Sequence, residues 1–363
     1  MKIRVLVGFL LSLIFIYFSF WKPDLAALFS GEIGFFAALF GKPRIDMVQL
    51  GAVLTHAKYG YLALVVLVLI ISLFFRAYRW RIILLPVSEH VSYWRVFAAM
   101  NIGYMVNNIL PLRMGEIFRA YIIGRSEHIS KSSALATIVV ERVIDTLAIL
   151  ILLGITIFFF PFPNWIRNGL FYVGAGILLL IAFMVGLLVS TKWTLKMLRI
   201  VFKPLPQKLT EQIVKIVESF SGGLEILRSS HHFVAITVHT VILEVCYVIS
   251  VILTLLAFSL ISADYPAIFT NPILASVVLL IIITIGVGLP SAPGAVGTFH
   301  GIVAFGVSLF SVPAEDSMGL AIALHLLNVV PLTILGLVCF WGQHFKFSEV
   351  SSQLPERSES PEN

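Results

Sequence analysis

Hydrophobic residues occur in long uninterrupted runs, such as YLALVVLVLIISLFF from Tyr61 to Phe75. An α-helix needs about 18 or more apolar residues to cross the hydrocarbon core of a bilayer. Candidate spans cover residues 5–21, 59–75, 132–162, 169–190, 232–262, 272–290 and 317–341, whereas 299–312 is too short for an ordinary crossing. The pattern predicts an all-α, polytopic membrane helix bundle with about seven or eight spans.

Composition agrees with a chain that lies mostly in lipid. Of the 363 residues, 59% are hydrophobic and 12% are charged, whereas a soluble domain carries about a quarter charged residues. The formal net charge of +6 is typical of Lys and Arg retained in cytoplasmic loops, so we expect no nucleic-acid partner. Cys246 and Cys339 stand inside apolar runs and predict neither a disulfide nor a metal site.

Basic residues beside the spans predict the orientation. Lys2 and Arg4 precede the first run, a cluster from Arg76 to Arg81 follows the second, and another surrounds Lys203. Lys and Arg are enriched on the cytoplasmic side of membranes. We therefore expect a multi-pass protein of the cell (cytoplasmic or inner) membrane with its N-terminus in the cytoplasm. The first run lacks a small-residue cleavage site and is interpreted as a retained helix.

Other segments lie outside the spans. Residues 192–231 have apolar residues at helical spacing between charges, which predicts a pair of cytoplasmic amphipathic helices divided at Pro204 and Pro206. Residues 24–50 fit an external loop with a short interfacial helix. Residues 348–363 are rich in Ser, Glu and Pro and predict a disordered tail. We expect one membrane domain over residues 1–347 and no soluble catalytic domain.

Residues 101–119 read NIGYMVNNILPLRMGEIFR, a half-apolar segment that Pro111 interrupts. This pattern predicts a re-entrant segment, and such breaks concentrate at substrate sites because their freed backbone groups must face protein or water. Arg113 could bind a phosphate with two hydrogen bonds, Glu116 could attract a cation or hold Arg113, and Asn108 could cap a broken end. The alternative is an ordinary cytoplasmic loop.

The third span contains a group of ionisable residues, Glu141, Arg142 and Asp145. Glu141 and Asp145 are one helical turn apart on one face. Charged residues inside a membrane are costly and usually serve a function, so we expect these three to face protein and one another. The alternative is a structural cluster at the inner interface that pins neighbouring helices.

A second break occurs at residues 286–301, GVGLPSAPGAVGTFHG. Gly and Pro at this density do not continue a helix. Backbone N–H groups from Gly294 to Thr298, at the start of the next helix, would favour an anion. Paired broken segments in the two halves of a chain indicate a transporter site, so we expect the two breaks to meet around one headgroup. The alternative is a kink covered by lipid.

Three strings in this order, NNILPLRMGEIFRA, ATIVVERVIDTLA and LPSAPGAVGTFHGIV, resemble the membrane region of the lysylphosphatidylglycerol synthase and flippase-like family. The resemblance runs from about Leu73 to Trp341. In many members a glutamate follows the last glycine motif, where this chain has His300. Together with the patterns above, the resemblance selects a substrate-binding set of Asn108, Arg113, Glu116, Arg119, Glu141, Arg142, Asp145, Pro293, Gly294, Gly297, Thr298 and His300.

The resemblance implies a stand-alone lipid translocase rather than an enzyme. Its expected substrate is an anionic phospholipid, a glycolipid or a polyprenyl-phosphate carrier, with no cofactor and no metal. The alternative is a membrane component of a lipid-modifying transferase, partnered by an enzyme for aminoacyl or glycosyl transfer. The pairs His325 with Asn328 and His239 with Glu244 are explained by hydrogen bonds between helices. A pure scaffold is disfavoured because it needs no paired breaks.

Overall fold

The computed structural model describes residues 2–30, 32–41, 43–110, 114–162, 175–176, 178–179, 182–183, 186–187, 189–204, 206–224 and 229–342. Within this described part the regular secondary structure is helical, apart from one isolated β-bridge between Trp21 and Pro43. The all-α helix bundle expected from the sequence is confirmed. Residues 348–363 and most of the candidate span 169–190 lie outside the described residues.

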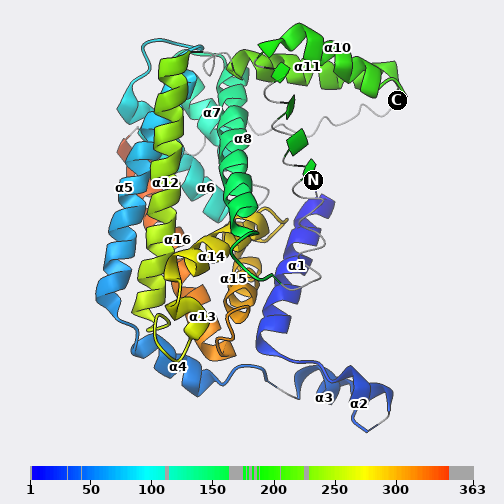
Figure 1. Cartoon of the computed structure of the whole chain (residues 1–363), viewed down its shortest axis with the longest axis vertical. Helices are drawn as coiled ribbons and strands as arrows, with labels where there is room; N and C mark the ends of the chain where they lie inside the picture. Colours follow the sequence, from blue (N-terminus) through cyan, green and yellow to red (C-terminus); the bar gives the residue numbers. More distant parts are fainter. Residues whose placement is uncertain are drawn as a thin grey trace, which may run out of the picture.

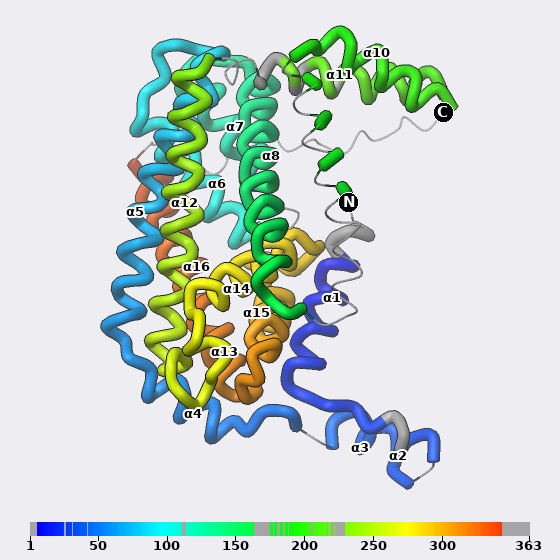
Figure 2. The backbone as a smooth tube through the Cα atoms, in the orientation of Figure 1, coloured from blue at the N-terminus to red at the C-terminus, as the bar shows by residue number. Residues whose placement is uncertain are grey.

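Three long helices, α5 (Tyr59–Leu84), α12 (Ser230–Ala257) and α8 (Lys131–Thr156), stand side by side in Figures 1 and 2. The other principal helices are α1 (Lys2–Phe20), α14 (Pro272–Val287) and α16 (Ala314–Gly342). Among the described residues, α5, α12 and α16 are long and apolar enough to cross a membrane. Helix α8 matches the 26-residue length of α5 but contains three charged residues in its middle.

Shorter helices occupy the two ends of the bundle (Figure 1). At one end lie α2 (Leu25–Phe29), α3 (Phe35–Phe40) and α4 (Met47–Thr55), where the sequence predicted a loop with one short helix. At the other end, α10 (Thr191–Val201) and α11 (Gln207–Leu224) lie across the bundle, where two amphipathic helices are expected. Helix α13 (Pro266–Phe269) is a single turn.

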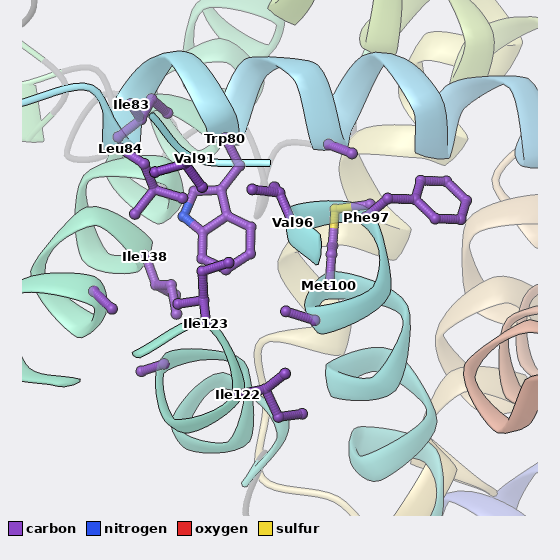
Figure 3. Packing of buried hydrophobic residues seen from close by; sticks show 14 of the residues in the cluster. Trp80, Ile83, Leu84, Val91, Val96, Phe97, Met100, Ile122, Ile123 and Ile138 are labelled. Atoms are coloured by element: carbon purple, nitrogen blue, oxygen red, sulfur yellow. The ribbon is translucent and has the colours of Figure 1, made fainter. Parts of the chain in front are cut away.

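Helix α5 extends beyond the span expected from the sequence. The candidate span ends at Phe75, and the helix continues to Leu84. Its last turns remain inside the protein, since Trp80 and Ile83 are both 0% exposed. In Figure 3, Trp80 lies among Val91, Ile123 and other apolar side chains. Because the end of α5 is packed in this way, its basic residues lie inside the bundle.

Two helices form a hairpin against this core, α6 (Tyr93–Ile109) and α7 (Gly115–Ser126). They pack closely where Gly103 faces Gly115, because a Cβ atom added to Gly115 would collide with the Gly103 carbonyl oxygen. Asn107 Oδ1 accepts the Gly115 N–H at 2.7 Å and secures the start of α7. The predicted re-entrant segment, residues 101–119, includes the last turns of α6 and the first turn of α7, and its break at residues 111–113 lies outside the described residues.

The second break separates α14 from α15 (Thr298–Ser308). Between them lies η3 (Pro293–Ala295), a single 3-10 turn in which Gly294 has φ of 64°. Helix α15 has 11 residues and packs between α14, α16 and α1. We refer to residues 292–298 as the glycine turn.

Candidate functional site

Glu141 of α8 is the centre of a buried group of charges. Its side chain is 0% exposed, and its Oε2 accepts a hydrogen bond from Arg119 Nη2 of α7 at 2.7 Å. Its Oε1 lies 3.4 Å from Arg76 Nε and 3.7 Å from Arg79 Nη2, both on α5. One carboxylate thus connects three arginines from two helices.

Asp145 lies one helical turn after Glu141 and faces the same way. Its carboxylate oxygens accept hydrogen bonds from Arg79 Nη2 at 2.5 Å and from Arg76 Nη2 at 2.7 Å. Arg142 Nη1 lies 3.6 Å from the same carboxylate. The expectation that the ionisable residues of α8 face protein and one another agrees with these contacts.

Neighbouring polar and aromatic groups fix the arginines in place. Arg76 Nη1 donates to the Tyr247 hydroxyl at 3.1 Å, and Arg79 Nη1 donates to Thr240 Oγ1 at 2.9 Å. The Arg119 guanidinium lies 4.0 Å from the centre of the Trp80 ring. Planar stacking of this kind suits arginine and not lysine. The orientation of each guanidinium is therefore set by protein contacts.

Glu116 pairs with an arginine of the next helix. Its Oε1 lies 3.0 Å from Arg142 Nε, so Glu116 joins α7 to α8 at a site where both side chains are about one-third exposed. Arg113, the proposed phosphate ligand, lies outside the described residues. The pairing with Arg142 agrees with the expectation that Glu116 attracts a cation, whereas a contact of Glu116 with Arg113 stays a prediction.

Among the described residues, the charge cluster contains four arginines and three carboxylates: Arg76, Arg79, Arg119 and Arg142 with Glu116, Glu141 and Asp145. Several buried donors in it have no hydrogen-bond acceptor among the described residues, including Arg79 Nε, Arg119 Nε and Arg119 Nη1. Buried polar groups are normally paired, because leaving one unpaired costs about 1–3 kcal/mol or more. The unpaired N–H groups of the cluster could therefore donate hydrogen bonds to an acceptor group.

The glycine turn is held by two histidines. Gly294 and Gly297 both have positive φ, 64° and 83°, a region that favours glycine. His325 Nε2 on α16 lies 2.7 Å from the Gly294 carbonyl oxygen. The Gly297 N–H donates to His300 Nδ1 at 3.2 Å. His300 thus caps the start of α15.

Helix α1 closes the other side of this turn. Ser12 Oγ accepts the Ala292 N–H at 2.9 Å and lies 3.1 Å from Thr298 Oγ1, whose residue is 0% exposed. The Ala295 N–H donates to the Ala292 carbonyl at 2.9 Å. Two amides of the expected anion pocket, those of Ala295 and Gly297, are therefore already used inside the turn.

The two broken segments lie in contact. A Cβ atom added to Gly294 would be 3.3 Å from the Asn108 carbonyl oxygen, and α6 packs on η3. The Asn108 side chain donates to Thr333 Oγ1 of α16 at 3.0 Å. The sequence predicted this meeting of the two breaks. Their contact places the end of α6 between the charge cluster and the glycine turn.

The sequence-predicted residues form two adjoining groups rather than one. Arg119, Glu141 and Asp145 lie in the charge cluster with Glu116 and Arg142. The remaining described residues gather at the glycine turn: Asn108, Pro293, Gly294, Gly297, Thr298 and His300. The tip of the α6–α7 hairpin joins them, because Asn108 touches the turn and Glu116 touches the cluster.

Sequence reasoning missed Arg76 and Arg79, which it assigned to a cytoplasmic flank. A signal was present, since the two residues are three positions apart on one helical face. Apolar residues also continue beyond them through Ile82, Ile83 and Leu84. A flanking loop would not need this continued pattern, so it indicated a helix that extends past its basic residues.

The fold and this cluster define an all-α membrane protein with ionic groups buried between helices. Residues 5–336 match the family model described as the lysylphosphatidylglycerol synthase TM region. The chain belongs to this family, as the sequence motifs implied.

Two curated relatives are archaeal proteins, each named as a UPF0104 membrane protein. The one from Methanothermobacter thermautotrophicus is 24% identical over 82% of this chain and 88% of its own length. The one from Methanocaldococcus jannaschii is 26% identical over 84% of this chain and 90% of its own length. No solved structure matches the chain significantly.

Proposed function

We propose that this protein translocates a lipid with an anionic headgroup across the cell membrane. The observation that carries the proposal is the set of unpaired arginine donors buried beside two broken helices. Arginine binds phosphate and carboxylate groups with paired hydrogen bonds, and these bonds are strongest away from water. An anionic phospholipid, a glycolipid or a polyprenyl-phosphate carrier would supply the missing acceptor.

The carboxylates make this site suitable for passage rather than permanent binding. Glu141 and Asp145 hold Arg76, Arg79 and Arg119 in position when no ligand is present. They also reduce the net positive charge, so that an anion is attracted without the full attraction of four free cations. A transport site must bind strongly enough to admit its substrate and weakly enough to release it.

The other predicted residues have roles that follow from their positions. Arg113 is proposed as a further phosphate ligand at the tip of the α6–α7 hairpin, between Leu110 and Met114. Asn108 and Gly294 keep the two broken segments together. In the proposed orientation, the N-terminus and α10–α11 lie in the cytoplasm.

The proposal is tested by movement of a fluorescent anionic phospholipid in reconstituted vesicles. Arg76→Lys and Arg113→Ala should each lower the rate, because Lys cannot reproduce the paired geometry of arginine and Ala removes the ligand. The matched control is Arg199→Lys on α10, where the Arg199–Glu211 pair of 3.2 Å is exposed. Each variant is first checked for an unchanged elution volume and thermal midpoint. Normal transport in both folded site variants would refute this site.

The second candidate is a membrane component of a lipid-modifying transferase. Its support is the name of the matched family model, which refers to a synthase. In that case the protein would present lipid to an aminoacyl or glycosyl transferase. The two candidates differ in one measurement, since a translocase moves unmodified lipid in vesicles that contain no other protein. A presenting subunit would move none there and would instead increase headgroup modification when its enzyme is added.

A further inference from the structure

The two histidines at the glycine turn differ in what a proton would do to them. A backbone N–H can only donate, so His300 Nδ1 must be the unprotonated nitrogen that accepts from Gly297. A carbonyl can only accept, so His325 Nε2 carries the hydrogen toward Gly294. A second proton on His325 leaves its contact intact. A second proton on His300 removes its acceptor.

Three local effects oppose a charged His300 while the turn stays closed. Its protonated Nδ1 would point an N–H at the N–H of Gly297. It stands in the first turn of α15, where the helix dipole is positive. The centre of its ring also lies 4.6 Å from that of His325. Proton binding and the closed turn therefore exclude each other.

We propose that His300 is a proton-binding site whose occupancy opens the glycine turn. The closed turn requires neutral His300, so a proton bound there releases the Gly297 N–H and frees the start of α15. By linkage, lowering the pH favours the open turn. His325 remains attached to Gly294 in both states and anchors the preceding half of the turn.

The pH response of the glycine turn is assigned to His300 and His325. On α16, His325 is the titratable residue whose ring contacts His300. Glu315 and Asp316 lie in the first turn of α16, where Glu315 accepts the Asp46 N–H and Asp316 accepts from the Tyr265 hydroxyl. Helix α14 contains no ionisable side chain, and Tyr17 of α1 donates its hydroxyl to the Leu39 carbonyl at 2.9 Å. Lys2 and Arg4 lie in the first turn of α1, well before Ser12. On α6, Tyr104 faces Arg76 of the charge cluster.

The position of this turn gives proton binding a consequence for transport, an extension that rests on the proposed function. Gly294 touches Asn108 at the end of α6, and a Cβ atom added to Gly297 would be 2.5 Å from the Ser12 carbonyl oxygen of α1. Opening the turn would therefore loosen α15 from α1 and from the α6–α7 hairpin. Protonation of His300 would thus change the packing of the helices around the path of the lipid headgroup.

The first test does not depend on transport. The protein is labelled with ¹⁵N at His and Gly, placed in lipid nanodiscs and titrated by NMR from about pH 8 down to about pH 3, because the closed turn opposes the charged form and moves the titration of His300 below the range of an ordinary histidine. Protonation of His300 and a shift of the Gly297 amide should share one midpoint. His300→Asn, which offers a permanent acceptor near the Nδ1 position, should abolish the Gly297 shift. His325→Gln, which keeps a donor, should retain it.

A matched control is His239→Gln. His239 lies on α12, and its Nδ1 is 2.7 Å from the Ala235 carbonyl, away from the turn. This variant should leave the Gly297 titration unchanged. A Gly297 amide that stays constant while His300 titrates, or a His300 that remains neutral throughout, would overturn the proposal.

The second test measures lipid movement in the same vesicles as a function of pH. The wild-type rate should change by up to about tenfold per pH unit, the limit for one linked proton. The rate of His300→Asn should be constant over the same range, with His239→Gln behaving as wild type. A pH response retained in His300→Asn would reject the coupling. If no form of the protein moves lipid, the proposed function fails while the NMR result still decides the proton site.

Discussion

Arg119 of α7 and Glu141 of α8 form an ion pair of 2.7 Å in which both side chains are buried, at 1% and 0% exposure. Burying such a pair requires removal of water from both charges, and the attraction between them does not always offset that cost. Here the guanidinium also stacks on Trp80, and Glu141 serves Arg76 as well. The pair is therefore part of a network that connects α5, α7 and α8.

Neutralising Glu141 should destabilise the protein far more than neutralising Glu116. Glu141→Gln leaves three arginines facing an uncharged amide, and breaking a buried pair costs about 3–5 kcal/mol. Glu116→Gln affects a partly exposed pair with Arg142, and such pairs contribute about 0–1 kcal/mol. Chemical denaturation of both variants in the same detergent measures the difference. Equal losses would show that Glu141 does not organise the cluster.

Replacing the whole Arg119–Glu141 pair by leucine should separate folding from function. Each single substitution to Leu leaves an unpaired buried charge, whereas the double substitution removes both charges and is often neutral or stabilising. We expect the double variant to recover at least about 1 kcal/mol relative to Glu141→Leu, by the coupling expected for residues in contact. Lipid movement should stay absent in all three variants. Restored transport in the folded double variant would make the pair purely structural.

The helix bundle could be predicted because lipid imposes a simple pattern on the sequence. Apolar runs predicted α5, α12 and α16, and dense Gly and Pro predicted the break before α15. The continuation of α5 beyond the candidate span was not predicted. Arg76 was interpreted as a flanking charge, and its partner Asp145 lies 69 positions later in the sequence. A rule based on flanking charge cannot recognise a partner on another helix.

The sequence predicted residues of the candidate site but not which of them contact one another. The motifs identified Glu116, Glu141 and Arg142, and these residues do lie together. The link from Glu116 to Arg142 depends on how α7 lies against α8. The first turn of α7 is positioned by the close packing of Gly115 on Gly103 of α6. Contacts of this kind follow from three-dimensional packing and leave no spacing signal in the sequence.

Adding a methyl group at Gly115 should disturb the hairpin. The new Cβ of Gly115→Ala would collide with the Gly103 carbonyl and lie 2.6 Å from Asn107 Oδ1. Overpacking of this kind costs about 1–3 kcal/mol. The control is Gly154→Ala on α8, where no heavy atom lies within 4 Å of the added Cβ, so that a gain of up to about 1 kcal/mol in helix propensity is expected. Thermal midpoints of the two variants should move in opposite directions.

The orientation in the membrane can be tested at the two ends of the bundle. Helices α10–α11 and α2–α3 lie at opposite ends in Figure 1, so they should face opposite sides of the membrane. Cys246 and Cys339 are first changed to Ser, because both are free thiols. A cysteine at Lys203, after α10, should then resist an impermeant thiol reagent added to intact cells and react after lysis.

A cysteine at Gly34, before α3, should react with the same reagent in intact cells, because the residue is exposed and no atom lies within 4 Å of an added Cβ. The expectation comes from the basic residues around Lys203 and at the start of α1, which favour the cytoplasm. Labelling of Lys203→Cys but not Gly34→Cys in intact cells would mean that the protein is inverted. Labelling of both would contradict the assignment of the two ends to opposite sides.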